Sequence, residues 1–596
     1  MSGVHRLTAW LEQCLGDPRD HRRALSVARS AACDRAEEFP DEAARELDGL
    51  GLSRWFAPAG SGGALRGMDE LLGIVRALAR RDLTVVVGCA TTYPAAAGVW
   101  LAGRPEQVAR LSGRVRAGAV VGLAVTEGEP GSDLPIGELT VRQLPGGGYR
   151  LDGEMRLVNN ADRSAFLCVL ARTVPVGGPG AFTLLCVDKE RLVPGSWRTL
   201  PAQRTVGVRG ADLSGIVFDG AELPDEARIG AWGEGLECVL KGRQLARTLC
   251  AGMSLGALDQ ALRLVLEFAH RHRLHGRRLI ELPQAARALA EVYAELLLAE
   301  TVGLVATRSA HTLPQEQSVA SAAVKFLVPT MADRSLGALR QLLGGRALLT
   351  RDHADGQFQK IERDHRAVGL FGGSPVVGLV ALIRQFPVLA RRYREGHHDP
   401  AGVAAAARLD APLPPLGAVP LSLQSRTGSS IVQSLPGAAE RIRALAGAGE
   451  VRGEIADRAD SLVRLCDGLH DELAAHRPAP RGIPDDAFGL ARRYSLLYAA
   501  AASLQLWLHN RPGGDAPAAA PPWADDGWLE AALARLEREL SGQPDPDDLD
   551  GPALDRLLPA LEEQRVTCRL FSLFPCVLAE SRPPSGGARS YGEPPG

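Results

Sequence analysis

Paired cysteines are absent from this sequence. The chain has ten cysteines in 596 residues, scattered singly, with no Cys-x-x-Cys pair and no histidine partner at metal-ligand spacing. This spacing excludes a disulfide framework of the kind that small secreted domains use, and it excludes a zinc site. We therefore expect reduced thiols, no bound metal and a cytoplasmic location.

An excess of charge of either sign is also absent. The 68 Lys and Arg residues nearly balance the 70 Asp and Glu residues, which gives a net charge of −2. A balance of this kind offers no electrostatic attraction for nucleic acid or for a membrane surface. Residues 1–17 lack a basic start followed by an apolar run, and no apolar run approaches the roughly 20 residues that cross a bilayer. We expect no secretion signal and no membrane span.

Aromatic residues are sparse, at 5%, although the apolar content of 45% is that of a globular protein. A chain of this length exceeds what one core normally serves, so we expect several folding units. Composition and periodicity divide it into helices over residues 1–117, short strands over 118–226, long helices over 227–392, an Ala/Pro-rich linker over 393–425, further helices over 426–582 and a disordered Gly/Pro/Ser-rich tail over 583–596.

Two periodicities support this division. Leu7, Trp10, Leu11 and Cys14 repeat at the spacing of one helix face. From residue 118 the period changes to two, in short runs separated by turn residues, which indicates a small antiparallel barrel or sandwich. In the next helical part, Gly252 and Gly256 predict a close contact between helices.

The most informative stretch is residues 124–133, Ala-Val-Thr-Glu-Gly-Glu-Pro-Gly-Ser-Asp. It leaves a strand-like run, 119–125, and enters a turn rich in Gly, Pro and Ser. Successive backbone N–H groups and the hydroxyls of Thr126 and Ser132 would suit a pyrophosphate or the edge of a flavin ring. The residues alone also fit an ordinary hairpin loop.

This stretch resembles the first signature of the acyl-CoA dehydrogenase family, with Pro130 and Ile136 departing from its small residues. Further segments resemble the family in the same order, over roughly residues 40–390. They are 151–154, 157–160, 206–210, 271–276, Lys325 with 341–345, and Arg363-Asp364. The resemblance implies a mainly α fold with an inserted β domain: an N-terminal helical domain, a central β-barrel and a C-terminal four-helix bundle, here with an extra C-terminal helical domain.

The resemblance also implies FAD as the cofactor. By analogy Thr126 contacts the flavin ring and Ser132 contacts the cofactor's phosphates or a nearby polar edge. Leu157 and Asn159 replace the usual Trp and Thr or Ser beside the ring. A neighbouring subunit would contribute Arg271 and His275, the latter in place of Phe, and the turn formed by Gln341, Gly344 and Gly345. Ser374 fits the family's turn near the active site. These contacts imply a homodimer or homotetramer, and the C-terminal helices could favour the dimer.

The family's catalytic carboxylate is missing from this sequence. Oxidation of an acyl thioester needs a base for the α-proton and a flavin for the β-hydride. The two positions where the family carries the glutamate are occupied by Gly372 and Ala246. The nearest carboxylates along the chain, Glu234 and Glu237, are weak candidates, because acidic residues are favoured at any helix start.

Three functions stay open. The first is FAD-dependent α,β-dehydrogenation of an acyl thioester on coenzyme A or an acyl carrier protein, with a specialised substrate of secondary metabolism. The second is a flavin monooxygenase of the same fold, which does not need the glutamate. The third is an inactive partner subunit. The electron acceptor is not indicated by the sequence.

Overall fold

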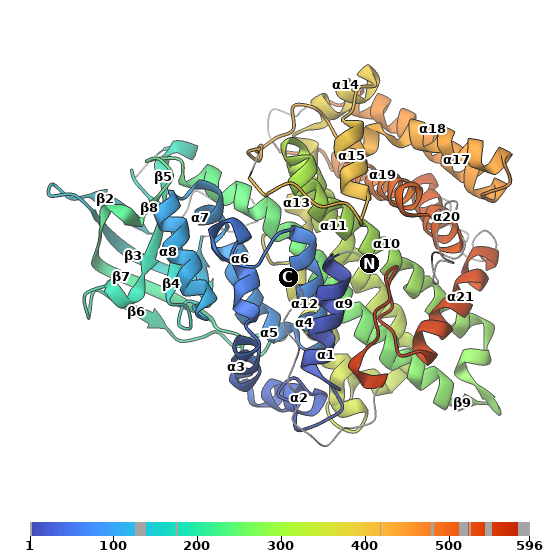
Figure 1. The fold of residues 1–596 in the computed structure, drawn as a ribbon, viewed down its shortest axis with the longest axis horizontal. Coiled ribbons are helices and arrows are strands. Elements are labelled where there is room, and N and C mark those ends of the chain that lie inside the picture. Colours follow the sequence, from blue (N-terminus) through green and yellow to red (C-terminus); the bar gives the residue numbers. More distant parts are fainter. Residues whose placement is uncertain are drawn as a thin grey trace.

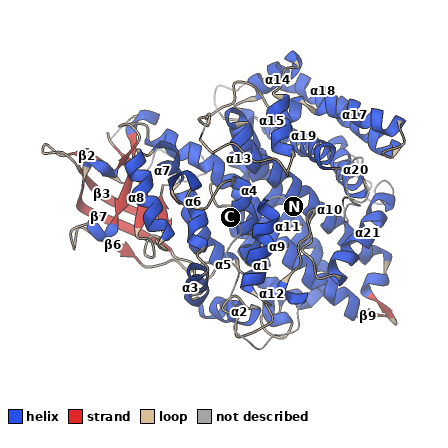
Figure 2. Ribbon diagram, in the orientation of Figure 1, coloured by secondary structure: helices blue, strands red, loops and turns tan. Residues whose placement is uncertain are grey.

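The computed structural model describes residues 3–125, 139–174, 177–417, 419–477, 482–511, 523, 526–542 and 551–581. Strands gather at one end of the molecule and helices fill the rest (Figures 1 and 2). The N-terminal helices are α1 (Gly3–Leu15), α2 (Val27–Ala36), α3 (Asp41–Gly49), α4 (Met68–Arg81), α5 (Leu83–Val85), α6 (Thr92–Ala95), α7 (Ala97–Ala102) and α8 (Pro105–Arg116). They lie between the sheet and the large helical bundle (Figure 1).

The β domain is one eight-stranded sheet, with the order β6-β7-β3-β1-β4-β5-β8 and β2 between β3 and β4. Its strands are β1 (Val121–Ala124), β2 (Thr140–Gln143), β3 (Tyr149–Asn159), β4 (Phe166–Arg172), β5 (Phe182–Asp188), β6 (Trp197–Leu200), β7 (Leu213–Leu223) and β8 (Arg228–Ile229). Most neighbouring strands pair antiparallel, as expected, but β1 and β2 pair with β4 in parallel. The consecutive strands β3 and β4 run in opposite directions, so a strand inserted between them is parallel to one of them.

β1 and β2 occupy successive parts of the same slot between β3 and β4. β1 pairs with β3 at Asn159, whereas β2 pairs with β3 from Tyr149 to Asp152. The chain therefore leaves the sheet after β1 and re-enters it at β2. The irregularity in β3 between Met155 and Val158 lies opposite this gap.

Long helices form the bundle: α9 (Gly235–Arg271), α10 (Pro283–Thr312), α11 (Gln317–Leu343), α12 (Gln357–Val368), α13 (Pro375–Ile383) and α14 (Phe386–Glu395). A short hairpin, β9 (Arg273–Leu274) and β10 (Arg277–Arg278), follows α9. The expected close contact at the two glycines of α9 is confirmed. A Cβ atom on Gly256 would lie 2.3 Å from the carbonyl oxygen of Arg76, and one on Gly252 would lie 2.9 Å from that of Leu72, so α9 and α4 approach closely.

The prediction of a linker over residues 393–425 is wrong. This segment contains α15 (Pro400–Ala407), whose first turn is capped by the side chain of Asp399. The buried guanidinium of Arg308 donates to the carbonyl oxygens of Ala405 and Ala406 at 3.1 and 3.0 Å. An Ala-rich composition fits a buried short helix as well as a linker, so composition alone misleads here.

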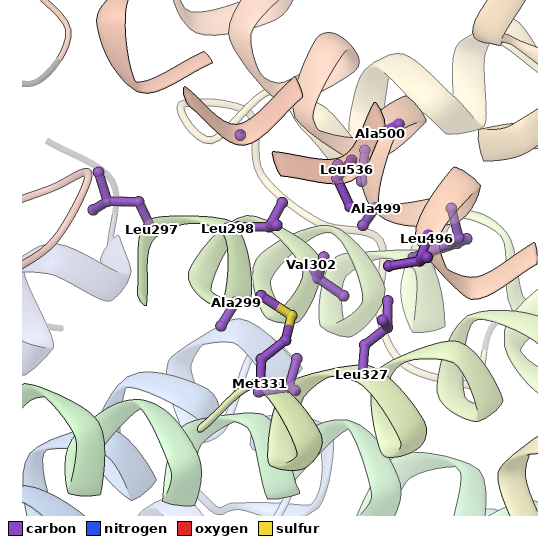
Figure 3. Close-up of a cluster of buried hydrophobic side chains, with 14 of the residues drawn as sticks. Leu297, Leu298, Ala299, Val302, Leu327, Met331, Leu496, Ala499, Ala500 and Leu536 are labelled. Carbon is purple, nitrogen blue, oxygen red and sulfur yellow. The ribbon is translucent and has the colours of Figure 1, made fainter. Parts of the chain in front are cut away.

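The C-terminal helices pack directly on the bundle. They are α16 (Ser430–Gln433), α17 (Leu435–Gly447), α18 (Gly453–Ala475), α19 (Asp485–Asn510), α20 (Gly527–Ser541) and α21 (Gly551–Val566). Figure 3 shows side chains of α19 and α20, such as Leu496 and Leu536, above Val302 of α10 and Leu327 of α11. Bundle and extension share one continuous hydrophobic core. The chain then runs back across the N-terminal helices to residue 581 (Figure 1).

Two stretches, Leu83–Ala102 and Gly235–Arg271, are long and apolar enough to cross a membrane by length and composition alone. The expectation that no stretch reaches this length is therefore wrong, because alanines and glycines extend the apolar runs. Within the fold, the most apolar part of the first stretch is 67% buried and that of the second stretch is 94% buried. Packing against neighbouring elements accounts for the apolar character of both.

Candidate active site

A cavity of about 930 Å³ lies where the β domain, the N-terminal helices and the bundle meet. Leu123 and Val125 line it from the end of β1, and Leu157 and Asn159 line it from β3. Thr91 and Pro94 contribute from the N-terminal helices, α9 supplies one wall, and residues 363–372 contribute from α12 and the turn after it. A mostly apolar cleft with a few polar groups is the common form of a cofactor or substrate site.

The loop with the first family signature falls outside the described residues, and so do Thr126 and Ser132. Val125, the last described residue before this loop, lines the cavity. The chain therefore reaches the cavity at the point where the signature begins.

Asn159 carries the clearest binding feature of the cavity. Its Nδ2 donates to the carbonyl oxygen of Val87 at 3.1 Å and to Oγ1 of Thr91 at 2.9 Å, which fixes the amide plane. Its Oδ1 is buried and has no hydrogen-bond partner among the described residues. A buried orphan acceptor is costly unless a ligand completes it. This geometry fits a ring with an N–H edge, such as a flavin.

Leu157 is held in the left-handed region, with φ of 57°, and is 70% exposed. It lines the cavity two residues before Asn159. An exposed leucine beside an otherwise buried site leaves this side of the cavity more open than a large aromatic side chain would.

Both positions where the family carries its glutamate face the cavity. Gly372 and Ala246 line it, and Nε of Arg247 donates to the carbonyl oxygen of Gly372 at 3.4 Å. Among the described lining residues, Glu154 is the only carboxylate, and it pairs with Arg156 at 2.6 Å. A proton-accepting carboxylate at either customary position is therefore missing from the described cavity.

Neither Glu234 nor Glu237 lies at the cavity. Oε2 of Glu234 accepts from the backbone N–H of Ala231 at 3.1 Å, and Glu237 pairs with Lys241 at 2.7 Å within α9. Both glutamates therefore make local contacts at the start of α9, where acidic side chains are generally favoured.

The buried side chain of Lys325 is hydrogen-bonded to the turn that carries Gly372. Nζ of Lys325 donates to the carbonyl oxygens of Val368 and Phe371 at 3.0 and 2.5 Å. It also lies 3.7 Å from Sγ of Cys250, which lines the cavity. Cys250 was not among the site residues predicted from the sequence, although its position four residues after Ala246 places both on one face of a helix.

The remaining expected cofactor residues are not among the described residues that line the cavity. Arg271, Gln341 and His275 are exposed, and His275 sits in the β9–β10 turn with φ of 50°. Gly344 and Gly345 follow α11 and are exposed too. Ser374 precedes α13 and is half-buried. Figure 1 places β9 at the opposite end of the molecule from the β domain.

No group of three or more His, Cys, Asp or Glu side chains that could hold a metal occurs in the part of the chain that the structure describes. All ten cysteines are free.

Residues 233–384 match the profile of the family described as "Acyl-CoA dehydrogenase, C-terminal domain". The chain is 27% identical over 195 residues to the mitochondrial 2-methylacyl-CoA dehydrogenase of Solanum tuberosum, which covers 33% of this chain and 46% of that protein. It is 22% identical over 380 residues to the probable acyl-CoA dehydrogenase fadE25 of Mycobacterium leprae, which covers 62% of this chain and 95% of that protein.

The fold is that of butyryl-CoA dehydrogenase from Megasphaera elsdenii, with a TM-score of 0.58 and 18% identity over 64% of this chain and 97% of that one. Similar folds occur in PigA, solved with FAD and proline (TM-score 0.56, 18% identity, 64% and 96% covered), and in the prolyl acyl carrier protein oxidase AnaB (0.54, 18%, 59% and 92%). The matching profile, the relatives and the shared fold support membership of the acyl-CoA dehydrogenase family.

Proposed function

We propose that the protein is an FAD-dependent oxidoreductase that introduces an α,β double bond into an acyl thioester. The observation that carries this proposal is the cavity of about 930 Å³, in which the buried Oδ1 of Asn159 lacks a partner in the described structure. FAD, when bound, supplies the acceptor for the hydride that leaves the β-carbon.

The residues that would hold FAD come from two places. Asn159 would accept a hydrogen bond from the ring, and Thr126 and Ser132 follow the cavity residue Val125 in the chain. Arg271 and His275 are exposed beside and within the β9–β10 hairpin, and Figure 1 shows β9 at the end of the molecule opposite the β domain, as expected of residues that act on a second copy. We therefore include a homodimer or homotetramer in the proposal. The ten free cysteines support a reducing, cytoplasmic setting.

The substrate is proposed to be a thioester on coenzyme A or on an acyl carrier protein, and AnaB is a carrier-protein oxidase of the same fold. A positioned general base typically contributes about 10²–10⁴ in rate. Without a carboxylate at Gly372 or Ala246, a substrate with an extra activating group at its α-carbon is favoured. A specialised substrate of secondary metabolism meets this need.

One observation favours a second function, oxygenation through the same cofactor. Leu157 is exposed and leaves the cavity open beside Asn159, where oxygen would need access. An inactive partner subunit is the third alternative and is favoured by the two missing carboxylates.

The spectrum of the purified protein separates these functions. We expect a yellow protein that bleaches without oxygen when it receives butanoyl-CoA or prolyl-pantetheine. A requirement for NAD(P)H and oxygen, with a product that has gained an oxygen atom, would instead establish the second function. A colourless protein that takes up no FAD would establish the third.

The role of Asn159 has its own test. Asn159→Leu removes the orphan acceptor together with the two bonds to Val87 and Thr91, so we expect FAD to bind about tenfold more weakly. Fluorescence titration with FAD measures the affinity. Thr140→Val, at an exposed position on β2 away from the cavity, is the control and should bind FAD as the unchanged protein does.

A further inference from the structure

A thiol lies between the two positions that lack a carboxylate. Cys250 lines the cavity one helical turn after Ala246. Its Sγ is 3.8 Å from the carbonyl oxygen of Phe371, the residue before Gly372. The sulfur therefore contacts both the turn that carries Gly372 and the part of α9 that carries Ala246.

A buried cation lies beside this sulfur. Lys325 is fully buried, and its Nζ is 3.7 Å from Sγ of Cys250. Its Nζ also donates to the carbonyl oxygens of Val368 and Phe371. A neighbouring ammonium group favours the thiolate form of a cysteine, which is the basic and nucleophilic form.

The site can satisfy both protonation states of the sulfur. As a thiolate, Cys250 accepts from Lys325. As a thiol, it has the carbonyl oxygen of Ala246 at 3.7 Å as an acceptor for its S–H. The sulfur therefore has a hydrogen-bond partner both before and after it takes up a proton.

Cys238, on the same helix, offers the opposite environment. It does not line the cavity, and burial, followed by the nearby Glu234 and Glu237, raises the pKa of its thiol. The two cysteines of α9 thus differ in access to the cavity and in the sign of the neighbouring charge.

We propose that Cys250, positioned by Lys325, is the proton acceptor that replaces the family's glutamate. In the step, the C–H bond at the α-carbon of the thioester breaks and an S–H bond forms on Cys250. The electron pair stays on the substrate as the enolate of the thioester. This inference rests on the proposed function and names the base for that reaction.

The first test follows the α-proton itself. The flavin-loaded protein is incubated in D₂O with butanoyl-CoA or prolyl-pantetheine, and mass spectrometry counts the deuterium at the α-carbon. We expect Cys250→Ala to lower the exchange rate about 100-fold or more, since a general base contributes on that order. Cys238→Ala should leave the rate unchanged. Exchange at the full rate in Cys250→Ala would overturn the proposal.

The second test needs neither FAD nor turnover. Alkylation by iodoacetamide is measured at several pH values, and peptide mass spectrometry resolves Cys250 from the other nine cysteines. Since thiolate is the reacting form, we expect Cys250 to react faster than Cys238 at pH 7. Lys325→Met should lower the alkylation rate of Cys250 about tenfold at this pH and leave the alkylation rate of Cys238 unchanged. If Cys250 reacted as fast in Lys325→Met as in the unchanged protein, the role given to Lys325 would be overturned.

Because Lys325→Met could disturb the turn at Phe371, Lys325→Arg is a second variant that keeps the charge. It should retain most of the alkylation rate of Cys250. Gly372→Glu in the Cys250→Ala background supplies a carboxylate from the other side of the site and should restore α-proton exchange. Failure of this rescue in a folded protein would count against the placement of Cys250 beside the substrate.

The outcomes distinguish this inference from the proposed function. If the unchanged protein oxidises a thioester but Cys250→Ala exchanges protons normally, the function stands and the base is elsewhere. If the unchanged protein neither oxidises nor exchanges any thioester tested, both fail. An acyl group found covalently on Cys250 would make it a nucleophile and overturn its role as a base.

Discussion

Helix α9 passes through two buried environments of opposite character. Its first half forms a wall of the cavity with Ala246 and Cys250 and contributes no carboxylate there. Nine residues after Cys250, Asp259 is fully buried and pairs with the equally buried Arg80 at 2.7 Å. The same helix therefore holds a buried carboxylate where cations and N–H groups surround it. The absence of a carboxylate is specific to the cavity wall.

The buried charged residues around Arg80 connect segments near both ends of the chain to the bundle. Arg80 of α4 also contacts Glu12 of α1 at 3.2 Å and Glu580 near the last described residue at 2.6 Å. Asp259 accepts a further bond from the backbone N–H of Phe571 at 2.9 Å. This network fastens the first helix and the C-terminal segment to the bundle.

Removing the central cation should have the largest effect. Arg80→Met leaves Glu12, Asp259 and Glu580 facing one another in a buried site, so we expect a loss of about 3–5 kcal/mol in the free energy of unfolding. Urea denaturation followed by circular dichroism measures it. Arg114→Met is the control, since the pair of Arg114 with Glu190 is exposed and should contribute far less to stability. Equal losses in the two variants would refute the assignment of the network.

Acid should weaken the same network by a somewhat smaller amount. Burial alone would raise the pKa of Glu580, but Arg80, Arg263 and Arg81 together lower it from 4.5 to about 2. A carboxyl with a lowered pKa stabilises the fold above its unfolded value, and this contribution is lost as the pH falls from about 4.5 toward 2. The shift corresponds to roughly 3 kcal/mol.

The variant Glu580→Gln tests this pH dependence. Its free energy of unfolding at pH 7 should be lower than that of the unchanged protein, and the difference should shrink between pH 5 and pH 2. Stability is measured by urea denaturation at each pH. A difference that stays constant over this range would show that Glu580 is not the titrating group.

The sequence predicted more of the fold than of the site. The helical spacing of α1, the change to period two and the two glycines of α9 are local signals, and the structure has the corresponding elements. Family resemblance located Gly372 and Ala246, which both reach the cavity. The network of Arg80 joins segments hundreds of residues apart, and the contact between Cys250 and Lys325 joins two helices. No local pattern encodes such pairings.

Adding a carboxylate to the cavity wall, which has none at Ala246 or Gly372, tests the difference between the two halves of α9. We expect both Ala246→Glu and Gly372→Glu to raise the rate with butanoyl-CoA about tenfold, which is about 1.4 kcal/mol, because each adds the carboxylate base of the family to the site. Anaerobic reduction of the bound flavin measures the rate. No gain from either variant, in protein that is folded and flavin-loaded, would contradict the mapping of the cavity.

The two variants should differ in stability. Gly372 has φ of 70°, where a side chain costs on the order of 1 kcal/mol or more, whereas Ala246 lies within a helix that accepts glutamate. Gly372→Glu should therefore unfold at a lower urea concentration than Ala246→Glu. The reverse order would show that burying the new charge on α9 costs more than the strained backbone.

The smallest effect is expected midway along α9, at Ser254. Its Oγ is 2.9 Å from Nε2 of His365, whose Nδ1 is 2.6 Å from Oδ1 of Asp333, so the three side chains form the hydrogen-bond order of a hydrolase triad. Ser254 is 1% exposed and does not line the cavity, unlike its neighbour Met253. A nucleophile must reach its substrate, so we assign this chain of bonds to packing between α9, α12 and α11.

Ser254→Ala should therefore lower the free energy of unfolding by about 1 kcal/mol, the usual contribution of one buried hydrogen bond, and leave thioester oxidation unchanged. Ser541→Ala, which removes an exposed hydroxyl, is the matched control and should change stability less. A fluorophosphonate probe that labelled Ser254 in the folded protein would reverse this assignment. The same helix would then carry a second reactive centre one turn beyond Cys250, outside the cavity that the structure describes.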